Sequence, residues 1–181
     1  NNTAVGYGAG NRLTTATFNT FLGTAAGFYT TTGVSNTVVG AVAGQGVSSS
    51  AHTGSENVIV GTAAGFVIQG DADQNTLVGR SAGFELTTGN NNLFLGHDSG
   101  RTGSPGGSIT TGSNEIVLGD ENISEAHIQV DWTVASDQRD KTDFTVLDLG
   151  LDFVKGLKPV TYKWDKRSKY IDKDNDNVDL D

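Results

Sequence analysis

Ser136 and Lys141 are the residues of this chain whose types and spacing most directly suggest covalent chemistry. A serine hydroxyl is a weak nucleophile until a base removes its proton. A lysine can act as that base when burial lowers the pKa of its amino group, because desolvation disfavours the charged form. A serine and a lysine at this spacing also occur in ordinary loops, so the pair alone leaves a catalytic and a structural interpretation open.

The other groups that commonly bind metals or cofactors show weaker patterns. His52, His97 and His127 are far apart and lack the spacing of metal ligands, and the absence of cysteine rules out disulfides and thiolate sites. The acidic run 172–176 imitates the first half of a calcium loop, but Asn177 occupies the position where glycine is expected. A solvated acidic loop is the favoured interpretation, and we expect no metal and no cofactor.

The elements that would position Ser136 lie on two sides of a compositional boundary. Residues 1–120 contain three Lys/Arg, seven Asp/Glu and 23 of the 25 glycines, whereas residues 121–181 contain nine Lys/Arg and fourteen Asp/Glu. The composition predicts glycine-rich repeats over 1–120, a connecting segment over 121–135 and a separate domain over 136–181. The absence of methionine and the start at Asn1 indicate a fragment or a processed product.

The overall charge and hydropathy exclude two classes of partner. A net charge of -9 argues against a protein that follows nucleic-acid phosphates. No apolar run is long enough to span a bilayer, so membrane insertion is not expected.

The first part of the chain repeats the pattern Asn-x-x-x-Gly-x-x-(Ala/Ser)-Gly. Six copies start at Asn2, Asn19, Asn36, Asn57, Asn75 and Asn92, and a degenerate seventh is the segment 115–119. Successive copies start 17, 17, 21, 18, 17 and 23 residues apart. Glycines in fixed phase at such a period predict a β-solenoid or β-roll, in which the asparagines form a hydrogen-bonded ladder along the stack.

Each repeat also carries two adjacent apolar residues, such as Phe21 and Leu22 or Val38 and Val39. These residue types favour a short strand, and neighbouring strand residues point to opposite faces. A single narrow solenoid has only one interior, so two apolar faces imply a partner sheet, most simply another copy of the chain. We therefore expect an all-β, trimeric β-roll or β-solenoid.

Residues 2–119 resemble the heads of trimeric autotransporter adhesins and the repeat tips of phage tail fibres, through the Asn-Thr-x-Val-Gly strand of 36–40 and its small-residue turn. The resemblance implies an interlocked trimer. Two longer repeats insert residues 45–54 and 101–108, and solenoid insertions form surface loops. We expect His52, Arg101 and Ser104 in these loops to be candidates for contact with a host-surface glycan or protein, although passive connectors are an equal alternative.

The pattern changes beyond the repeats. Ile128, Val130, Trp132 and Val134 alternate with polar residues, which predicts a connecting strand within 121–135. A helix-compatible apolar run over 147–157 ends before Pro159, and a strand is expected around 160–164. These features predict the start of a small α+β domain.

The segment from Ser136 to Tyr162, with the run 136–143 and the later segments 150–154 and 157–162, is similar to the opening of the intramolecular chaperone auto-processing domain. That domain ends phage endosialidases, tail spikes and tail fibres, and also occurs in a eukaryotic membrane-bound transcription factor. The resemblance implies that the domain helps the fibre to trimerise and then cuts its own chain at Ala135–Ser136. Ser136 would be the nucleophile and Lys141 the base of a serine peptidase that turns over once.

Two functions follow from these resemblances. The first is a virion protein made in the host cytoplasm: a homotrimeric tail fibre or spike joined to other tail proteins upstream, which attaches to a host surface. The second is a bacterial trimeric autotransporter-like adhesin head without protease activity. The similarity that starts at Ser136 favours the first.

Overall fold

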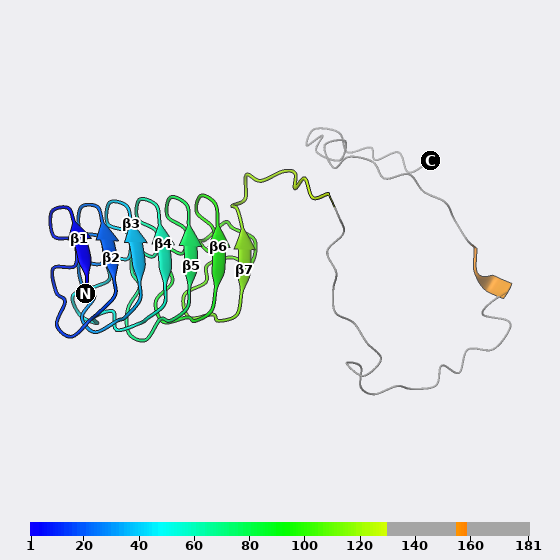
Figure 1. Cartoon of the computed structure of the whole chain (residues 1–181). Coiled ribbons are helices and arrows are strands. Elements are labelled where there is room, and N and C mark those ends of the chain that lie inside the picture. The colour runs from blue at the N-terminus through cyan, green and yellow to red at the C-terminus, as the bar shows by residue number, and fades with distance from the viewer. Residues whose placement is uncertain (130–154, 159–181) are drawn as a thin grey trace, which may run out of the picture. The chain divides into compact units, whose positions relative to one another are not determined.

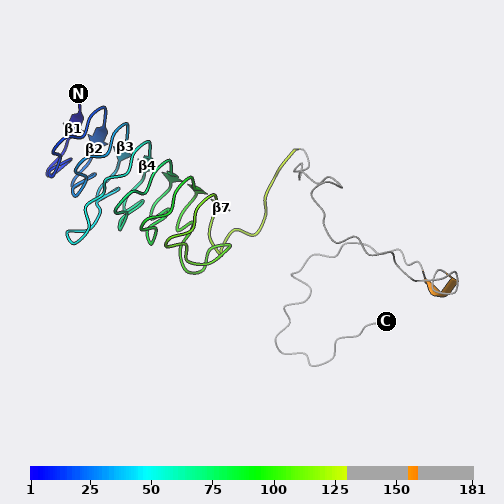
Figure 2. The same cartoon turned by 90° about the horizontal axis from the view of Figure 1, so that it is seen from below.

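The computed structural model describes residues 1–129 and 155–158, and residues 1–129 form one compact unit. Most of this unit is a stack of successive rungs, and each rung contributes one strand, as Figure 1 and Figure 2 show. Seven parallel strands form a single sheet in the order of the sequence. Their bounds are β1 Thr3–Val5, β2 Thr20–Leu22, β3 Thr37–Val39, β4 Val58–Val60, β5 Thr76–Val78, β6 Leu93–Leu95 and β7 Ile116–Leu118.

The strand register follows the sequence repeat. Thr20 pairs with Thr37, and Phe21 pairs with Val38, so that equivalent positions of successive repeats lie side by side. The insertions in the longer repeats leave this register unchanged, because Val38 still pairs with Ile59 across one of them. The predicted β-solenoid is therefore confirmed, and the described residues are almost entirely without helix.

The middle residue of each strand from β2 to β7 faces the interior and is buried, whereas Ala4 of the end strand β1 is exposed. Phe21, Ile59, Leu77 and Phe94 are fully buried, and an alanine column that includes Ala64 closes the core. In a rung this narrow, one large side chain and a few small ones fill the space between opposite walls. The single core explains why an apolar residue recurs at one phase of every repeat.

An asparagine ladder runs through the stack beside this core. Asn57 donates from its backbone N and from Nδ2 to Oδ1 of Asn36, at 2.9 Å in each case. Its Nδ2 also donates to the carbonyl of Ala72, and its own Oδ1 accepts from Asn75. The same bonds recur between the other ladder residues, from Asn2 to Asn92, so the predicted ladder is present.

Glycine is required where the chain leaves each strand. Gly40 has a φ of 135°, and a Cβ there would lie 2.6 Å from the carbonyl oxygen of Gly61. An L side chain fits neither the backbone conformation nor the space. The first glycine of the repeat therefore allows rungs to approach closely at this corner.

The segment after the solenoid differs from the sequence prediction. Residues 121–129 form a turn followed by irregular, exposed chain, so the described part of the predicted 121–135 connecting strand is not a strand. Ile123 and Ile128 are exposed, and the rest of the predicted alternation, Val130, Trp132 and Val134, lies outside the described residues. Lys155 and Gly156 lie in a helical turn, and the remainder of the expected α+β domain lies outside the described residues. In the described part of the chain, no helix has the length and apolar character needed to cross a membrane.

Candidate functional site

The outer face of the sheet is the most extended surface feature of the solenoid. The third residue of each strand points outward, opposite to the buried middle residue. These residues, which we term the outer apolar column, are Val5, Leu22, Val39, Val60, Val78, Leu95 and Leu118. Leu22 is 46% exposed and Leu118 is 44% exposed. Every member is apolar, so the single chain presents a continuous hydrophobic stripe to solvent.

The first residue of each strand also points outward and flanks this stripe. It is threonine in β1, β2, β3 and β5, and Val58, Leu93 and Ile116 in the other strands. In the seven described strands, neither outward position holds an ionisable residue. The face is therefore uncharged along its length and is more apolar towards β7. A contiguous surface of this kind is typical of a contact with another protein or of a ligand-binding groove.

His52 lies inside the first insertion and not on its surface. The side chain is 1% exposed, and its backbone bridges Thr30 and Gly70 of the neighbouring rungs. Nδ1 lies 3.3 Å from Oγ1 of Thr30, and Nε2 lies 3.3 Å from the carbonyl oxygen of Ala72. Burial lowers the pKa of His52, and this effect outweighs the opposing influence of the Ala72 bond and of nearby aspartates. The ring supports the rung, and a ligand at the surface does not reach it.

Arg101 and Ser104 lie together in the second insertion, in a different rung from His52. Nη1 of Arg101 donates to Oδ1 of Asp98 at 2.8 Å, and the guanidinium lies 4.7 Å from the ring centroid of Phe84. Oγ of Ser104 accepts from the backbone N of Gly100 at 3.1 Å, and Ser104 is buried. Arg101 keeps a partly exposed cation, whereas Ser104 holds the loop.

A column of ionisable side chains absent from the sequence prediction lies at another corner. Nη1 of Arg80 is 2.7 Å from Nε2 of His97, and Nδ1 of His97 is 3.0 Å from Oδ2 of Asp120. The bond from His97 is the main reason that the pKa of Asp120 lies below its ordinary value. Each of the three residues directly follows the corner glycine of its repeat. An alignment of the repeats would therefore have predicted from the sequence that these three side chains lie in contact.

The predicted catalytic residues lie outside the described residues. Ala135, Ser136 and Lys141 fall between residues 130 and 154, and the acidic run 172–176 falls within 159–181. The roles of Ser136 as nucleophile and Lys141 as base therefore stay sequence-based predictions. Among residues 1–129 and 155–158, no group of three or more His, Asp or Glu side chains is arranged to hold a metal ion.

The chain was compared with models of known protein families. Residues 136–179 match the family described as chaperone of endosialidase. This match supports a C-terminal chaperone segment of the kind found in phage tail fibres and spikes, and the β-solenoid is consistent with such a fibre. No significant similarity to a curated protein or to a solved structure was found.

Proposed function

We propose that this chain is part of a phage tail fibre or tail spike that trimerises, attaches to a host surface and is processed by its own chaperone segment. The observation that carries the proposal is the chaperone-family match over residues 136–179, which follows a parallel β-solenoid in the same chain. The virion is the corresponding location, after synthesis in the host cytoplasm. Other tail proteins would join the fibre upstream.

The outer apolar column supports assembly of the chain with copies of itself. Seven apolar residues at a rung spacing of about 4.8 Å form a straight stripe. A matching stripe on another copy has the same spacing and no charge, so the two can lie against each other over their full length. Three copies arranged around one axis would remove all three stripes from water, and burial of apolar area favours that state.

Self-cleavage at Ala135–Ser136 would proceed in two steps. With the amino group of Lys141 as base, Oγ of Ser136 loses its proton and attacks the carbonyl carbon of Ala135. The amide C–N bond breaks, the nitrogen of Ser136 takes up a proton, and an ester joins the two residues. Water then hydrolyses the ester, which releases a carboxylate at Ala135 and restores the serine hydroxyl. Each chain undergoes this reaction once, so the reaction is a maturation step.

Assembly and attachment are tested on the chain expressed with its complete downstream domain. Sedimentation equilibrium should give three times the mass of one processed chain, and the purified protein should adsorb to cells of the virus's host and compete with the virus. A folded, stable monomer would contradict the trimer. A trimer that neither adsorbs to these cells nor competes with the virus would contradict the attachment function.

A further inference from the structure

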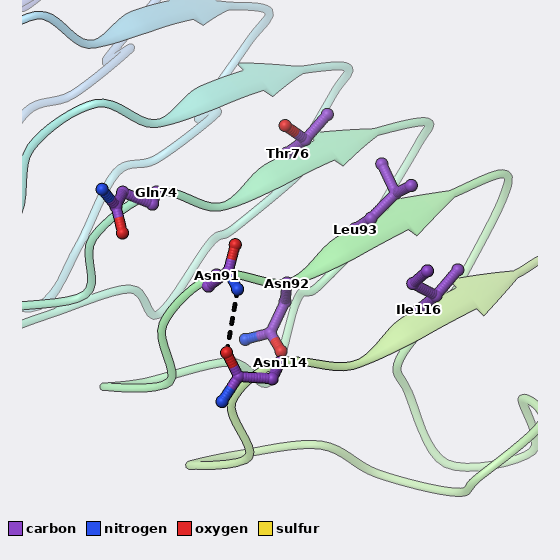
Figure 3. A pocket seen from close by; sticks show the side chains of 7 residues that line it. All are labelled: Gln74, Thr76, Asn91, Asn92, Leu93, Asn114 and Ile116. Atoms are coloured by element: carbon purple, nitrogen blue, oxygen red, sulfur yellow. Dashed lines mark hydrogen bonds between the residues drawn. The ribbon is translucent and has the colours of Figure 1, made fainter. Parts of the chain in front are cut away.

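The corner of the solenoid that precedes β5, β6 and β7 carries a column of side-chain amides. Gln74, Asn91 and Asn114 occupy the same position in three successive repeats, immediately before the ladder position, and all three are exposed. We term these three residues the amide corner. They line a hollow of about 340 Å³ together with Asn92 and with Thr76, Leu93 and Ile116 at the starts of the strands (Figure 3).

The backbone holds the amide corner in a fixed conformation. Gln74, Asn91 and Asn114 have φ values of 59°, 54° and 64°, in the left-handed region. The backbone N of each donates to the previous rung, to Ser55, Asp73 and Asn90 in turn, at 2.9, 3.0 and 3.0 Å. The next residue of two of these repeats is a buried ladder asparagine. The side chains are therefore presented by a rigid scaffold, which lowers the conformational cost of binding.

The amides retain unused hydrogen-bonding capacity. Nδ2 of Asn91 donates to Oδ1 of Asn114 at 2.8 Å, drawn in Figure 3. This bond uses only one donor hydrogen of Asn91 and one acceptor lone pair of Asn114. The carbonyl oxygen of Asn91 can still accept a hydrogen bond, and the amide nitrogen of Asn114 can still donate. A ligand whose adjacent atoms can both donate and accept hydrogen bonds matches these free amide groups. Vicinal hydroxyl groups have that property.

The rest of the hollow selects the class of ligand. Leu93 and Ile116 project from successive strands beside the amides and provide an apolar surface for the C–H face of a sugar ring (Figure 3). The amides repeat along the stack at about 4.8 Å. A polymer with hydroxyl groups repeated along its length can therefore use several rungs at once.

The local charge favours a neutral ligand. The residues that line the hollow carry no ionisable group. A neighbouring hollow of about 230 Å³ is lined by Ser55, Glu56, Asp73 and Gln74, and its two carboxylates would repel an acidic sugar. We propose that the amide corner is a binding site for a neutral host-surface glycan. This inference rests on the proposed attachment function and assigns the contact to the amide corner, outside the two insertions.

The test compares the full chain with the double variant Asn91→Gly/Asn114→Gly. Glycine removes both amides and tolerates the positive φ, so the fold should be kept. The probes are immobilised neutral hexose oligosaccharides and oligosaccharides of the same length that carry carboxylates. We expect the full chain to bind the neutral set, and the double variant to bind at least tenfold more weakly. Ser35→Gly is the matched control, because Ser35 has the same repeat position and a φ of 59° but lies away from the hollow.

Several results would overturn the inference. These are no binding to any neutral oligosaccharide, equal binding by the double variant, or stronger binding to the acidic set. A change in oligomeric mass in the double variant would instead place the amide corner between copies of the chain. Host-cell adsorption separates the two proposals: a double variant that adsorbs as well as the full chain leaves the attachment function intact and refutes the amide corner as its site.

Discussion

At the scale of single residues, the ladder asparagines are the side chains on which the solenoid most depends. Asn57 is fully buried and bonds to Asn36, Ala72 and Asn75. The described residues contain no buried side-chain N or O atom without a hydrogen-bond partner. A ladder substitution therefore creates several unsatisfied groups at once.

The variant Asn57→Ala should lower the free energy of unfolding by about 3 kcal/mol or more. Each buried group left without a partner costs about 1–3 kcal/mol, and the change affects both neighbouring rungs. Denaturant unfolding followed by circular dichroism measures the effect. The exposed Thr62→Ala in the adjacent turn should change stability by less than about 0.5 kcal/mol. Equal stability of the two variants would contradict the structural role of the ladder.

His52 makes the stability of the solenoid depend on pH. Burial depresses the pKa of His52 in the folded chain, so the unfolded chain binds a proton more readily. The stabilisation due to neutral His52 is present above the unfolded pKa of about 6.5 and is lost as pH falls through the lower folded pKa. Between those limits, stability should fall by up to about 1.4 kcal/mol per pH unit.

The pH dependence is measured as unfolding midpoints between about pH 4 and about pH 8, a range that brackets the ordinary histidine pKa. His52→Gln should flatten the fall, whereas His127→Gln should not, because the side chain of His127 is 89% exposed. A slope that is the same in wild type and His52→Gln would show that other groups titrate on unfolding.

At the scale of elements, the strand pattern was the most predictable part of the structure. The apolar pairs predicted the strands, and the constant position of the asparagine in each repeat predicted the ladder. In a regular repeat, equivalent residues of successive rungs lie side by side, so one rung predicts the next. The environment of Leu22 was harder to predict. The sequence indicated that both faces of the strand are apolar, but the single chain buries only the face that carries Phe21. Whether the other face is covered would depend on assembly with another chain, which the sequence of one chain does not encode as a local pattern.

The loops were harder to predict than the strands. A histidine among Gly, Ser and Thr looks like a surface residue, yet His52 is buried because the insertion folds back between Thr30 and Gly70. That closure depends on tertiary contacts without a repeated pattern. Arg80, His97 and Asp120, by contrast, follow the corner glycines, so the repeat alignment contained the information needed to place them together.

The outer apolar column is tested by Val39→Asp and Leu95→Asp. Val39 is only partly buried in the chain and Leu95 is 37% exposed, so each variant should fold. In an assembled trimer, each would place three unpaired carboxylates in an apolar layer, which is strongly unfavourable. Sedimentation should show dissociated chains, while Ala41→Asp at an exposed turn should remain trimeric. Unaltered trimers from both column variants would count against this interface.

At the scale of the whole molecule, two parts of different character follow each other in the sequence. The sheet face of the solenoid, from β1 to β7, is uncharged, and the segment matched to chaperone of endosialidase begins at residue 136. Each rung pairs only with its neighbours, and the strands at the two ends of the stack leave backbone groups unpaired. Under the proposed function, a chaperone segment would cover such edges during assembly and would then be cut away.

The most direct test of the account is the intact mass of wild type, Ser136→Ala and Lys141→Ala, each expressed with the complete downstream domain. Lys155→Ala serves as the control because Lys155 is an exposed lysine in the same segment. We predict that wild type and Lys155→Ala yield a product ending at Ala135, and that the other two variants remain uncut. Uncut wild type, or cleavage in Ser136→Ala, would contradict the self-processing chaperone.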